Sequence, residues 1–335
     1  MDNKPSARGT PRQDTNDTAD KQREIQREQD RKDAQQQGGP AKGEKGAVQT
    51  GPREHPDQLP AQHMQKPGSE AQMRLKPQFL APDYRGSGKL KGMVALITGG
   101  DSGIGRSVAV LYAREGADVA IVYLASHEDA EETKRCVENE GRQCLLIPGD
   151  VKDPAFCNDA VERTVAEFDR LDILVNNAAF QEHAESLADI TDERMWETFN
   201  TNIMGYMRMA RAALPHLKQG ACIINTGSVT GLRGSKKLLD YSATKGAIHA
   251  FTMSLASSLV DKGIRVNAVA PGPVWTPLNP ADQTAEKVAE FGKQTDFKRP
   301  AQPEELSPAY VFLASPVCSS YITGIVLPVT GSVGS

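Results

Sequence analysis

A tyrosine and a lysine that could exchange a proton stand four residues apart in Tyr241-Ser-Ala-Thr-Lys245. Because residues at this spacing lie on one face of a helix, Tyr241 and Lys245 would share an edge. A free phenol has a pKa of about 10, which is too high for efficient proton exchange at neutral pH. A neighbouring ammonium group favours the phenolate and lowers that pKa toward the working range. The same spacing also fits an amphipathic helix with one exposed lysine, so other residues must support the catalytic interpretation.

Further polar residues follow apolar runs elsewhere in the chain. Ser228 comes shortly after the run Cys222–Asn225, where its hydroxyl would project above a sheet edge, although a serine there is more often a turn or cap residue. Asn202 lies within a helical pattern that asparagine disfavours. In the segment Asn176-Asn177-Ala178-Ala179, which follows an apolar run, the side-chain amides could hold the backbone and a cofactor in register. The segment Pro271-Gly-Pro-Val-Trp-Thr276 follows another apolar run and forms a rigid turn that could line a pocket.

A glycine-rich turn with the pattern T-G-x-x-x-G-x-G extends from Thr98 to Gly105. The apolar run Val94–Thr98 precedes it, and apolar residues at helical spacing follow it. Glycines permit a tight turn and a close approach of the backbone to a ligand, and the N–H groups at a helix N-terminus face anions. A glycine turn alone is a weak signal, but strand, turn and helix in this order predict a site for a dinucleotide diphosphate.

Strand and helix patterns alternate along the rest of the chain. This alternation predicts a single-domain α/β fold of the Rossmann type, a doubly wound parallel sheet of seven strands. Ligands of such sheets bind beyond the carboxyl ends of the strands, and every candidate residue above falls at a strand end or on the following helix. Expected strands are Val94–Thr98, Val119–Tyr123, Cys144–Ile147, Leu171–Val175, Cys222–Asn225, Ile264–Val269 and Ile325–Val329; expected helices include Glu128–Glu140, Ala155–Phe168, Thr191–Leu217 and Tyr241–Leu259.

Composition divides the chain into three parts. Residues 1–75 are rich in charged residues, Gln, Gly and Pro, so they bury too little apolar surface to offset their ordering entropy. We expect them to form a disordered polar tail. Residues 76–90 are expected to form an arm that packs on the domain, and residues 91–335 to form the domain itself.

Charge, cysteines and hydropathy exclude several classes of protein. A net charge of −4 and an isoelectric point near 5.9 do not suggest nucleic acid as a partner. The five cysteines show no C-x-x-C spacing and are expected to be free thiols in a reducing compartment, the cytoplasm. The six histidines include no pair at metal-ligand spacing, so no metal site is expected. No apolar run reaches the length of about 18 residues that a membrane span requires, so no membrane partner is expected.

Taken together, these segments resemble the short-chain dehydrogenase/reductase family from about Leu90 to Leu327. The glycine motif, the Asn-Asn-Ala segment, the helical asparagine, the serine, tyrosine and lysine, and the P-G-x-x-x-T turn all come in the family's order and spacing. The arm and the residues Gly-Gly-Asp-Ser-Gly are similar to a subgroup of general stress proteins and glucose/ribitol dehydrogenase homologues. Residues 1–75 lie outside the resemblance.

The resemblance implies hydride transfer with NAD or NADP as cofactor. Tyr241 would be the general acid in carbonyl reduction and the base in alcohol oxidation, and Lys245 would lower its pKa and bind the nicotinamide ribose. Ser228 would hold the substrate oxygen, and Asn202 would support a water molecule that relays protons to Lys245. The expected cofactor-binding residues are Thr98, Gly99, Asp101, Ser102, Gly103, Ile104, Gly105, Tyr123, Asp150, Val151, Asn177, Ala178, Ala179, Tyr241, Lys245, Pro271, Gly272, Val274 and Thr276.

Within that set, the resemblance implies a position along the cofactor for several residues. Asp150 is the expected adenine contact, and Asn177 is expected near the adenosine ribose. Val274 and Thr276 would hold the carboxamide of the nicotinamide.

Two departures from the family pattern concern the cofactor and the oligomer. The second strand ends at Tyr123, where many NAD-preferring members carry aspartate and NADP-preferring members often carry arginine. Ser102 is neutral where NADP-preferring members often place Lys or Arg, and Asp101 would mildly repel a 2′-phosphate, so the residues favour NAD weakly. The ending Leu327-Pro-Val-Thr-Gly-Ser replaces the usual acidic-Gly-Gly ending, in a region that commonly packs between subunits of the homotetramer that the resemblance implies.

The expected substrate is a small aldehyde, ketone, sugar or polyol. Loops after the fourth strand and before Tyr241 would shape its pocket, and a later loop would form a mobile lid. A second enzymatic candidate is a 3-oxoacyl-carrier-protein reductase, which would need a basic patch at the mouth of the site. The pocket residues are Phe180, Gln181, Glu182, His183 and Leu232–Leu238, the lid is Pro277–Phe297, and the basic candidates are Arg233, Lys236 and Lys237.

A hypothesis from a different class is a cofactor-binding stress protein that acts through its charged tail. The intact set of Ser228, Tyr241 and Lys245 argues against a purely non-catalytic role. Deletion of the tail separates the two hypotheses, because an enzyme would keep its turnover and a tail-driven protectant would lose its effect.

Overall fold

The computed structural model describes residues 46–56 and 58–331, so residues 1–45 of the tail expected over residues 1–75 lie outside the described residues. From Ala47 onward the chain forms one compact unit. Among the described residues, no helix combines the length and the apolar character needed to cross a membrane. All five cysteines are free thiols, as expected.

A parallel sheet of seven strands forms the centre of the unit, in the order β3-β2-β1-β4-β5-β6-β7. The strands β1, β5 and β6 are buried along their whole length because both faces of the sheet are covered, and most of their residues are accordingly apolar. The expected doubly wound fold is confirmed. The strands are β1 (Val94–Thr98), β2 (Asp118–Tyr123), β3 (Cys144–Pro148), β4 (Ile173–Asn176), β5 (Cys222–Thr226), β6 (Arg265–Pro271) and β7 (Val326–Val329).

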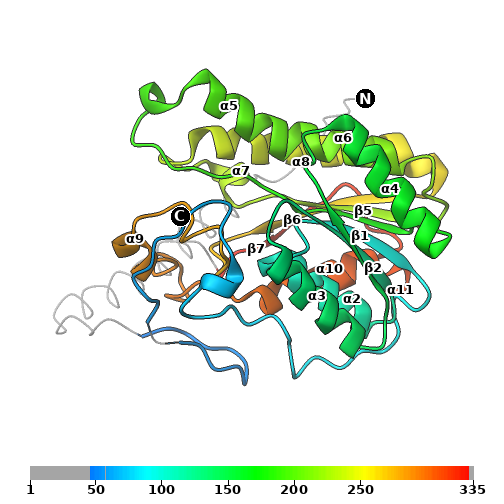
Figure 1. Cartoon of the computed structure of the whole chain (residues 1–335), viewed down its shortest axis with the longest axis horizontal. Coiled ribbons are helices and arrows are strands. Elements are labelled where there is room, and N and C mark those ends of the chain that lie inside the picture. Colours follow the sequence, from blue (N-terminus) through cyan, green and yellow to red (C-terminus); the bar gives the residue numbers. More distant parts are fainter. Residues whose placement is uncertain (1–45, 57, 332–335) are drawn as a thin grey trace, which may run out of the picture. The chain divides into compact units, whose positions relative to one another are not determined.

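Helices pack on both faces of the sheet (Figure 1). One apolar core lies between the sheet and α2 (Gly103–Arg114), α3 (His127–Asn139) and α10 (Pro303–Ala314). A second core lies between the opposite face and α4 (Pro154–Phe168), α6 (Gly205–Ala213) and α8 (Leu239–Leu259). The shorter helical elements are η1 (Glu70–Gln72), η2 (Leu187–Asp189), α5 (Asp192–Phe199), η3 (Asn200–Met204), α7 (Thr230–Arg233), η4 (Val260–Lys262), α9 (Ala285–Ala289) and α11 (Pro316–Ser319).

The long helical region expected from Thr191 has an interruption. Its start is as predicted, since the Thr191 hydroxyl accepts a hydrogen bond from the Arg194 N–H at 3.2 Å and so caps α5. Between α5 and α6, however, η3 is a wider π turn that contains Asn202. Such turns are rare and often occur at functional sites.

The N-terminal arm begins earlier than the sequence predicted. The Val48 N–H donates to the Phe297 carbonyl at 2.9 Å, and the buried side chains of Met64 and Met73 pack with Trp275 and Val288. The boundary expected at residue 75 therefore falls inside a packed segment. Composition could not reveal this, because the apolar residues here are few and most of the segment's partners are polar groups far away in the sequence.

The sheet reverses its strand order between β1 and β4. The strands β2 and β3 lie on one side of β1. The chain then returns to the centre of the sheet and places β4 on the other side of β1. Loops that leave neighbouring strands in opposite directions at such a switch point open a crevice at the carboxyl edge of the sheet. The candidate site lies in that crevice.

Candidate active site

The glycine turn connects β1 to the N-terminus of α2 and depends on its glycines. Gly103 has a φ of +50°, and a Cβ at that position would lie 2.9 Å from the Thr276 side chain. A Cβ on Gly105 would overlap the carbonyl oxygen of Gly99. These positions need glycine because the turn is tight and because it approaches the loop after β6 closely.

Thr98 and Asn177 hold this turn against the end of β4. The Thr98 hydroxyl accepts hydrogen bonds from the N–H groups of Asn177 at 2.9 Å and Ala178 at 3.1 Å. The Asn177 amide donates to the carbonyls of Thr98 at 3.2 Å and Gly99 at 3.0 Å. Two of the expected site residues therefore fix the crevice by binding to each other.

Tyr241 and Lys245 lie together on α8, as their spacing predicted. The Lys245 Nζ lies 5.3 Å from the centroid of the Tyr241 ring and 5.6 Å from that of Tyr206. It donates a hydrogen bond to the Thr226 carbonyl at the end of β5, at 2.8 Å. Both side chains are buried from bulk water, yet both line the cavity described below.

Burial changes the acidity of both groups. It lowers the pKa of Lys245 to about 7, because a charged ammonium is disfavoured away from water. The pKa of the Tyr241 phenol is raised by burial and not lowered as the sequence predicted, and only a hydrogen bond with Ser228 opposes that rise. A shifted tyrosine and lysine that share one cavity wall are typical of a proton-transfer site.

Ser228 is held beside Tyr241 by two neighbours. Its hydroxyl oxygen accepts hydrogen bonds from the Thr230 N–H at 3.1 Å and the Thr230 hydroxyl at 3.0 Å. Its own N–H donates to Nε2 of the buried His249 at 3.4 Å. Burial, with the nearby Lys245 charge, lowers the pKa of His249 and favours the neutral ring that can accept this bond. The sequence analysis missed His249, which stands one helical turn after Lys245.

Asn202 lies behind the cavity wall and does not line the cavity. Its amide oxygen accepts from the Phe180 N–H at 2.8 Å, and its amide nitrogen donates to the Phe180 carbonyl at 2.9 Å and to the Thr244 hydroxyl at 3.1 Å. Asn202 thereby joins the π turn η3 to the loop after β4 and to α8. The wider turn gives this short side chain access to both partners.

A cavity of about 1040 Å³ connects these groups. Among the expected site residues, Thr98, Gly105 and Asn202 do not line it and instead support those that do. The expected residues that line it are Gly99, Asp101, Ser102, Gly103, Ile104, Tyr123, Asp150, Val151, Asn177, Ala178, Ala179, Ser228, Tyr241, Lys245, Pro271, Gly272, Val274 and Thr276.

One end of the cavity, beside β2 and β3, carries several polar groups. The Tyr123 hydroxyl lies 2.9 Å from His127 Nδ1, and burial raises the pKa of the Asp101 carboxyl to about 6. Lys152 also lines this end, but its ammonium is paired with Glu197 at 2.6 Å and lies 3.5 Å from Asp150. The charge of this lysine is therefore already balanced by carboxylates.

The turn after β6 forms another wall. The Gly272 N–H donates to the Val329 carbonyl at 2.9 Å, so β7 holds this turn in place. The Asn279 amide donates to the Thr276 hydroxyl at 3.1 Å and to the Val274 carbonyl at 2.6 Å. The unusual ending after Leu327 thus still supports the site through its backbone.

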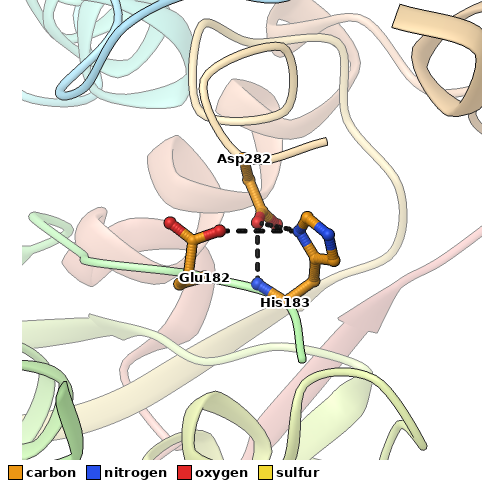
Figure 2. Close-up of side chains that lie close together, drawn as sticks. All are labelled: Glu182, His183 and Asp282. Atoms are coloured by element: carbon orange, nitrogen blue, oxygen red, sulfur yellow. Dashed lines mark hydrogen bonds and ion pairs between the residues drawn. The ribbon is translucent and has the colours of Figure 1, made fainter. Parts of the chain in front are cut away.

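The opposite end of the cavity is closed by three segments: the loop after β4, the expected lid, and the arm. Figure 2 shows Glu182, His183 and Asp282 close together at this junction. Asp282 accepts from the His183 N–H at 2.8 Å, and its carboxylate also lies 2.9 Å from His183 Nδ1 and 2.5 Å from the Gln181 amide nitrogen. Since the Asp282 oxygens already have these partners, the cluster fastens the loop to the lid.

Lys66 brings the arm to the same junction. Its Nζ lies 3.0 Å from the Glu182 carboxylate and donates to the carbonyls of Gln181 at 2.7 Å and Ala281 at 3.1 Å. A cation this close to Glu182 disfavours a metal ion there. Lys66, Pro67 and Gly68 line the cavity, and the sequence analysis placed all three in the tail. The Pro67-Gly68 dipeptide is a turn signal that could have drawn attention to them.

The cavity fits a dinucleotide. A diphosphate would lie at the glycine turn, where Gly103, Ile104 and Gly105 begin α2 and the absence of side chains permits close approach. The volume exceeds that of a typical small-molecule pocket and leaves room for a substrate at Tyr241. The fold and this cavity together define a protein of the Rossmann type that is suited to binding a dinucleotide.

Comparisons with known proteins identify the family. The family model described as enoyl-(acyl carrier protein) reductase matches residues 99–333. General stress protein 39 of Bacillus subtilis is 56% identical over 278 residues, which cover 83% of this chain and 97% of that protein. The chain belongs to the short-chain dehydrogenase/reductase family of oxidoreductases. The expected resemblance, including that to the stress-protein subgroup, is confirmed.

Two further relatives bear on chemistry. The protein named glucose and ribitol dehydrogenase from Daucus carota is 48% identical over 282 residues, covering 82% of this chain and 96% of its own. A short-chain dehydrogenase from Burkholderia cenocepacia, solved in complex with NADP, is 34% identical with a TM-score of 0.69, covering 74% of this chain and 100% of its own. A nicotinamide cofactor for this family member is therefore supported.

Proposed function

We propose that the protein interconverts a carbonyl and a hydroxyl group on a small aldehyde, ketone, sugar or polyol, with Tyr241 as general acid and base. The single observation that carries the proposal is the placement of the Tyr241 phenol on the cavity wall, hydrogen-bonded to Ser228 and beside the Lys245 ammonium. This arrangement offers a proton donor and an oxygen-binding hydroxyl at one point.

Each residue of the site has a separate role in the proposed reaction. When bound, a nicotinamide cofactor supplies the hydride for reduction or receives it in oxidation. In reduction, Ser228 donates a hydrogen bond to the substrate carbonyl oxygen, and Tyr241 gives its proton to that oxygen as charge develops. Lys245, when protonated, stabilises the phenolate that remains and binds the nicotinamide ribose. Asn202 keeps η3 in position for a water that returns a proton through Lys245. Oxidation follows the same steps in reverse.

We assign the cofactor contacts as the resemblance implies. The turn from Thr98 to Gly105 would hold the diphosphate, Asp150 the adenine and Asn177 the adenosine ribose. Val274 and Thr276 would hold the carboxamide. NAD is favoured over NADP, because the Lys152 ammonium at the adenosine end is balanced by Glu197 and Asp150, and a charged Asp101 would repel a 2′-phosphate.

The cavity lining favours a polar substrate over an acyl chain. Gln181, Asn279, Gln283 and Lys66 contribute polar groups to this lining. The name of the Daucus carota relative supports a sugar or polyol. The second candidate, 3-oxoacyl-carrier-protein reductase, is supported by the description of the family model but lacks a strong basic patch, because Lys237 is paired with Glu185 at 2.7 Å.

The proposal includes a homotetramer in the cytoplasm. The helices α5, α6 and α8 lie in one layer (Figure 1). Large apolar side chains on these helices and on η3 are exposed, including Trp196, Met204, Met207 and Met253. A face of this kind suits burial against a second copy of the chain. In a reducing compartment the five free cysteines would stay reduced.

Calorimetric titration of NAD and NADP into wild type and Tyr241→Phe, with reduction of glyceraldehyde and oxidation of ribitol and glucose, tests the proposal. The variant is expected to keep its cofactor Kd within about twofold and to lose turnover by about 100-fold or more. Full turnover in Tyr241→Phe would refute the assigned role. Failure of both cofactors to bind wild type would refute the oxidoreductase proposal and leave the tail hypothesis.

A further inference from the structure

The arm provides a buried carboxylate to the glycine turn. One oxygen of the Glu70 side chain accepts a hydrogen bond from the Gly103 N–H, the first of α2, at 2.8 Å. Glu70 is 1% exposed although it belongs to a surface turn, η1. The first N–H groups of a helix have no acceptor within the helix, and they carry partial positive charge. Glu70 therefore satisfies one of the groups that open the diphosphate site.

Arg106 extends this contact to a second point of the turn. Its guanidinium pairs with the other Glu70 oxygen, and both side chains are almost completely buried. The same guanidinium donates to the Asp101 carbonyl from Nε at 3.0 Å and from Nη2 at 2.7 Å. Glu70 thus holds Gly103 directly and Asp101 through Arg106, and these two residues enclose the bend of the turn.

The position of Glu70 is itself imposed by α3. The Asp129 carboxylate accepts from the N–H groups of Glu70 and Ala71, both at 2.8 Å, and from the Ser69 hydroxyl at 2.9 Å. Asp129 belongs to the helix that follows β2. The arm is therefore attached to the rigid part of the dinucleotide fold and not only to loops.

The same stretch of the arm continues along the cavity wall. A Cβ on Gly68 would lie 2.8 Å from the Pro277 carbonyl oxygen, so the arm passes directly over the residues that follow Thr276. Lys66, Pro67 and Gly68 line the cavity between the glycine turn and the lid. One continuous segment of the arm, residues 66–70, therefore contacts both the expected diphosphate site and the expected nicotinamide site.

We infer that the arm is part of the cofactor-binding machinery and that Glu70 is a positioning residue for the glycine turn. The inference rests on the proposed use of a nicotinamide dinucleotide. Part of the cost of binding is the ordering of loops that close around a ligand. Because Glu70 and Arg106 hold the turn before the ligand arrives, the N–H groups that remain, such as that of Ile104, meet the diphosphate in a prepared position. The Arg106 guanidinium offsets part of the Glu70 charge, although it also lies 3.6 Å from the Asp129 carboxylate.

The test is calorimetric titration of the favoured cofactor into full-length Glu70→Ala and Glu70→Gln, with Gln72→Ala as the matched control. Gln72 lies on the same turn but is exposed. We expect Glu70→Ala to raise the cofactor Kd by about 10- to 100-fold. Glu70→Gln retains an acceptor for the Gly103 N–H and is expected to recover part of the loss. Gln72→Ala is expected to match wild type.

Steady-state kinetics separate positioning from general damage. In Glu70→Ala the KM for the cofactor should rise while kcat at saturating cofactor and the KM for the carbonyl substrate stay within about twofold. A wild-type Kd in both Glu70 variants would overturn the inference, and so would an equal loss in kcat and in both KM values. Wild-type protein that binds no cofactor would instead refute the proposed function.

Hydrogen exchange on wild type provides a second measurement that does not depend on the folding of a variant. Cofactor should slow amide exchange in residues 66–73 as well as in residues 99–106. Protection of the glycine turn without any protection of the arm would overturn the inference.

Discussion

The Nζ atom of Lys245 and the carbonyl oxygen of Thr226 are joined by a hydrogen bond of 2.8 Å at the floor of the cavity. A carbonyl accepts a hydrogen bond but does not neutralise a charge, and Lys245 is 1% exposed. The ammonium therefore remains costly to bury, and the pKa of Lys245 falls to about 7. This one contact places the lysine where the mechanism needs it and leaves its charge sensitive to pH.

The first prediction concerns the stability of the cofactor-free protein against pH. The pKa of Lys245 is lower in the folded than in the unfolded state, so between pH 7 and about 10 the unfolded state binds more protons. Stability contributed by this group is therefore gained as pH rises. Urea denaturation at about pH 7.5 and about pH 9.5, which lie inside that window, measures the free energy of unfolding. This free energy should increase more between the two pH values for wild type than for Lys245→Met. The difference should be about 2–2.5 kcal/mol.

Lys262→Met is the control for that experiment, because it removes a lysine from the exposed turn η4. This variant is expected to follow wild type at both pH values. If the free energy of unfolding depended equally on pH in wild type and in Lys245→Met, the lowered pKa of the buried Lys245 would be contradicted.

The second prediction concerns Asn202. Replacement by alanine removes three hydrogen bonds and leaves the N–H and carbonyl of Phe180 without their amide partners. Such a loss costs about 1–3 kcal/mol, so kcat/KM for the substrate should fall by about tenfold or more. Cofactor Kd should change less, because Phe180 lies at the substrate end. Asn158→Ala, an exposed change on α4, provides the control, and an unchanged kcat/KM in Asn202→Ala would count against the prediction.

The third prediction concerns Lys66. The Lys66→Ala variant loses the bonds to the Gln181 and Ala281 carbonyls and leaves Glu182 without its cation. We expect the KM for a hydroxylated aldehyde to rise by about 5- to 10-fold, since each bond to a charged group is worth about 1.5–3 kcal/mol and water replaces part of it. Initial rates with saturating cofactor measure this. Lys134→Ala, on the surface of α3, should behave as wild type, and an equal rise in both variants would argue against a specific role.

The fourth prediction separates the tail from the arm. Deletion of residues 2–45 should leave kcat/KM within about twofold, because the compact unit begins at Ala47. Deletion of residues 2–75 should raise the cofactor Kd at least as much as Glu70→Ala does, because it removes Glu70 together with the segment that lines the cavity. Activity assays and the protection of a heat-sensitive test enzyme would be measured on both proteins. Loss of protection with intact turnover in the shorter deletion would support the stress-protein hypothesis for the tail.

The fifth prediction concerns the oligomer. Met253 is 49% exposed on α8, and Trp196 is 65% exposed on α5. Light scattering at micromolar concentration should give a tetramer for wild type and a smaller species for Met253→Glu, since a charge buried in an interface is strongly unfavourable. Leu80→Glu, an exposed change on the arm, should remain tetrameric. A monomeric wild type would refute the prediction.

Much of the fold and of the site could be predicted because the signals are local. The turn from Thr98 to Gly105 lies between a buried strand and a helix, and Tyr241 and Lys245 are neighbours on one helix face, so short windows of sequence contain the relevant physics. The contribution of Glu70 could not be predicted in this way, because its partners Gly103 and Arg106 lie more than thirty residues away. His249 was missed for a related reason: its role appears only when α8 packs beside the end of β5.

Some partners of the arm come from the last quarter of the chain. The Leu75 carbonyl accepts from the Trp275 indole at 3.0 Å, and the Ala81 N–H donates to Glu304 at 2.5 Å. The partners of Glu70, in contrast, are Gly103, Arg106 and Asp129, which a ribosome makes soon after the arm. The arm can therefore hold the glycine turn early in synthesis, but its contacts with Trp275 and Glu304 must wait until the chain is nearly complete. Closure of the cavity wall by the arm is thus a late event in the synthesis of the polypeptide.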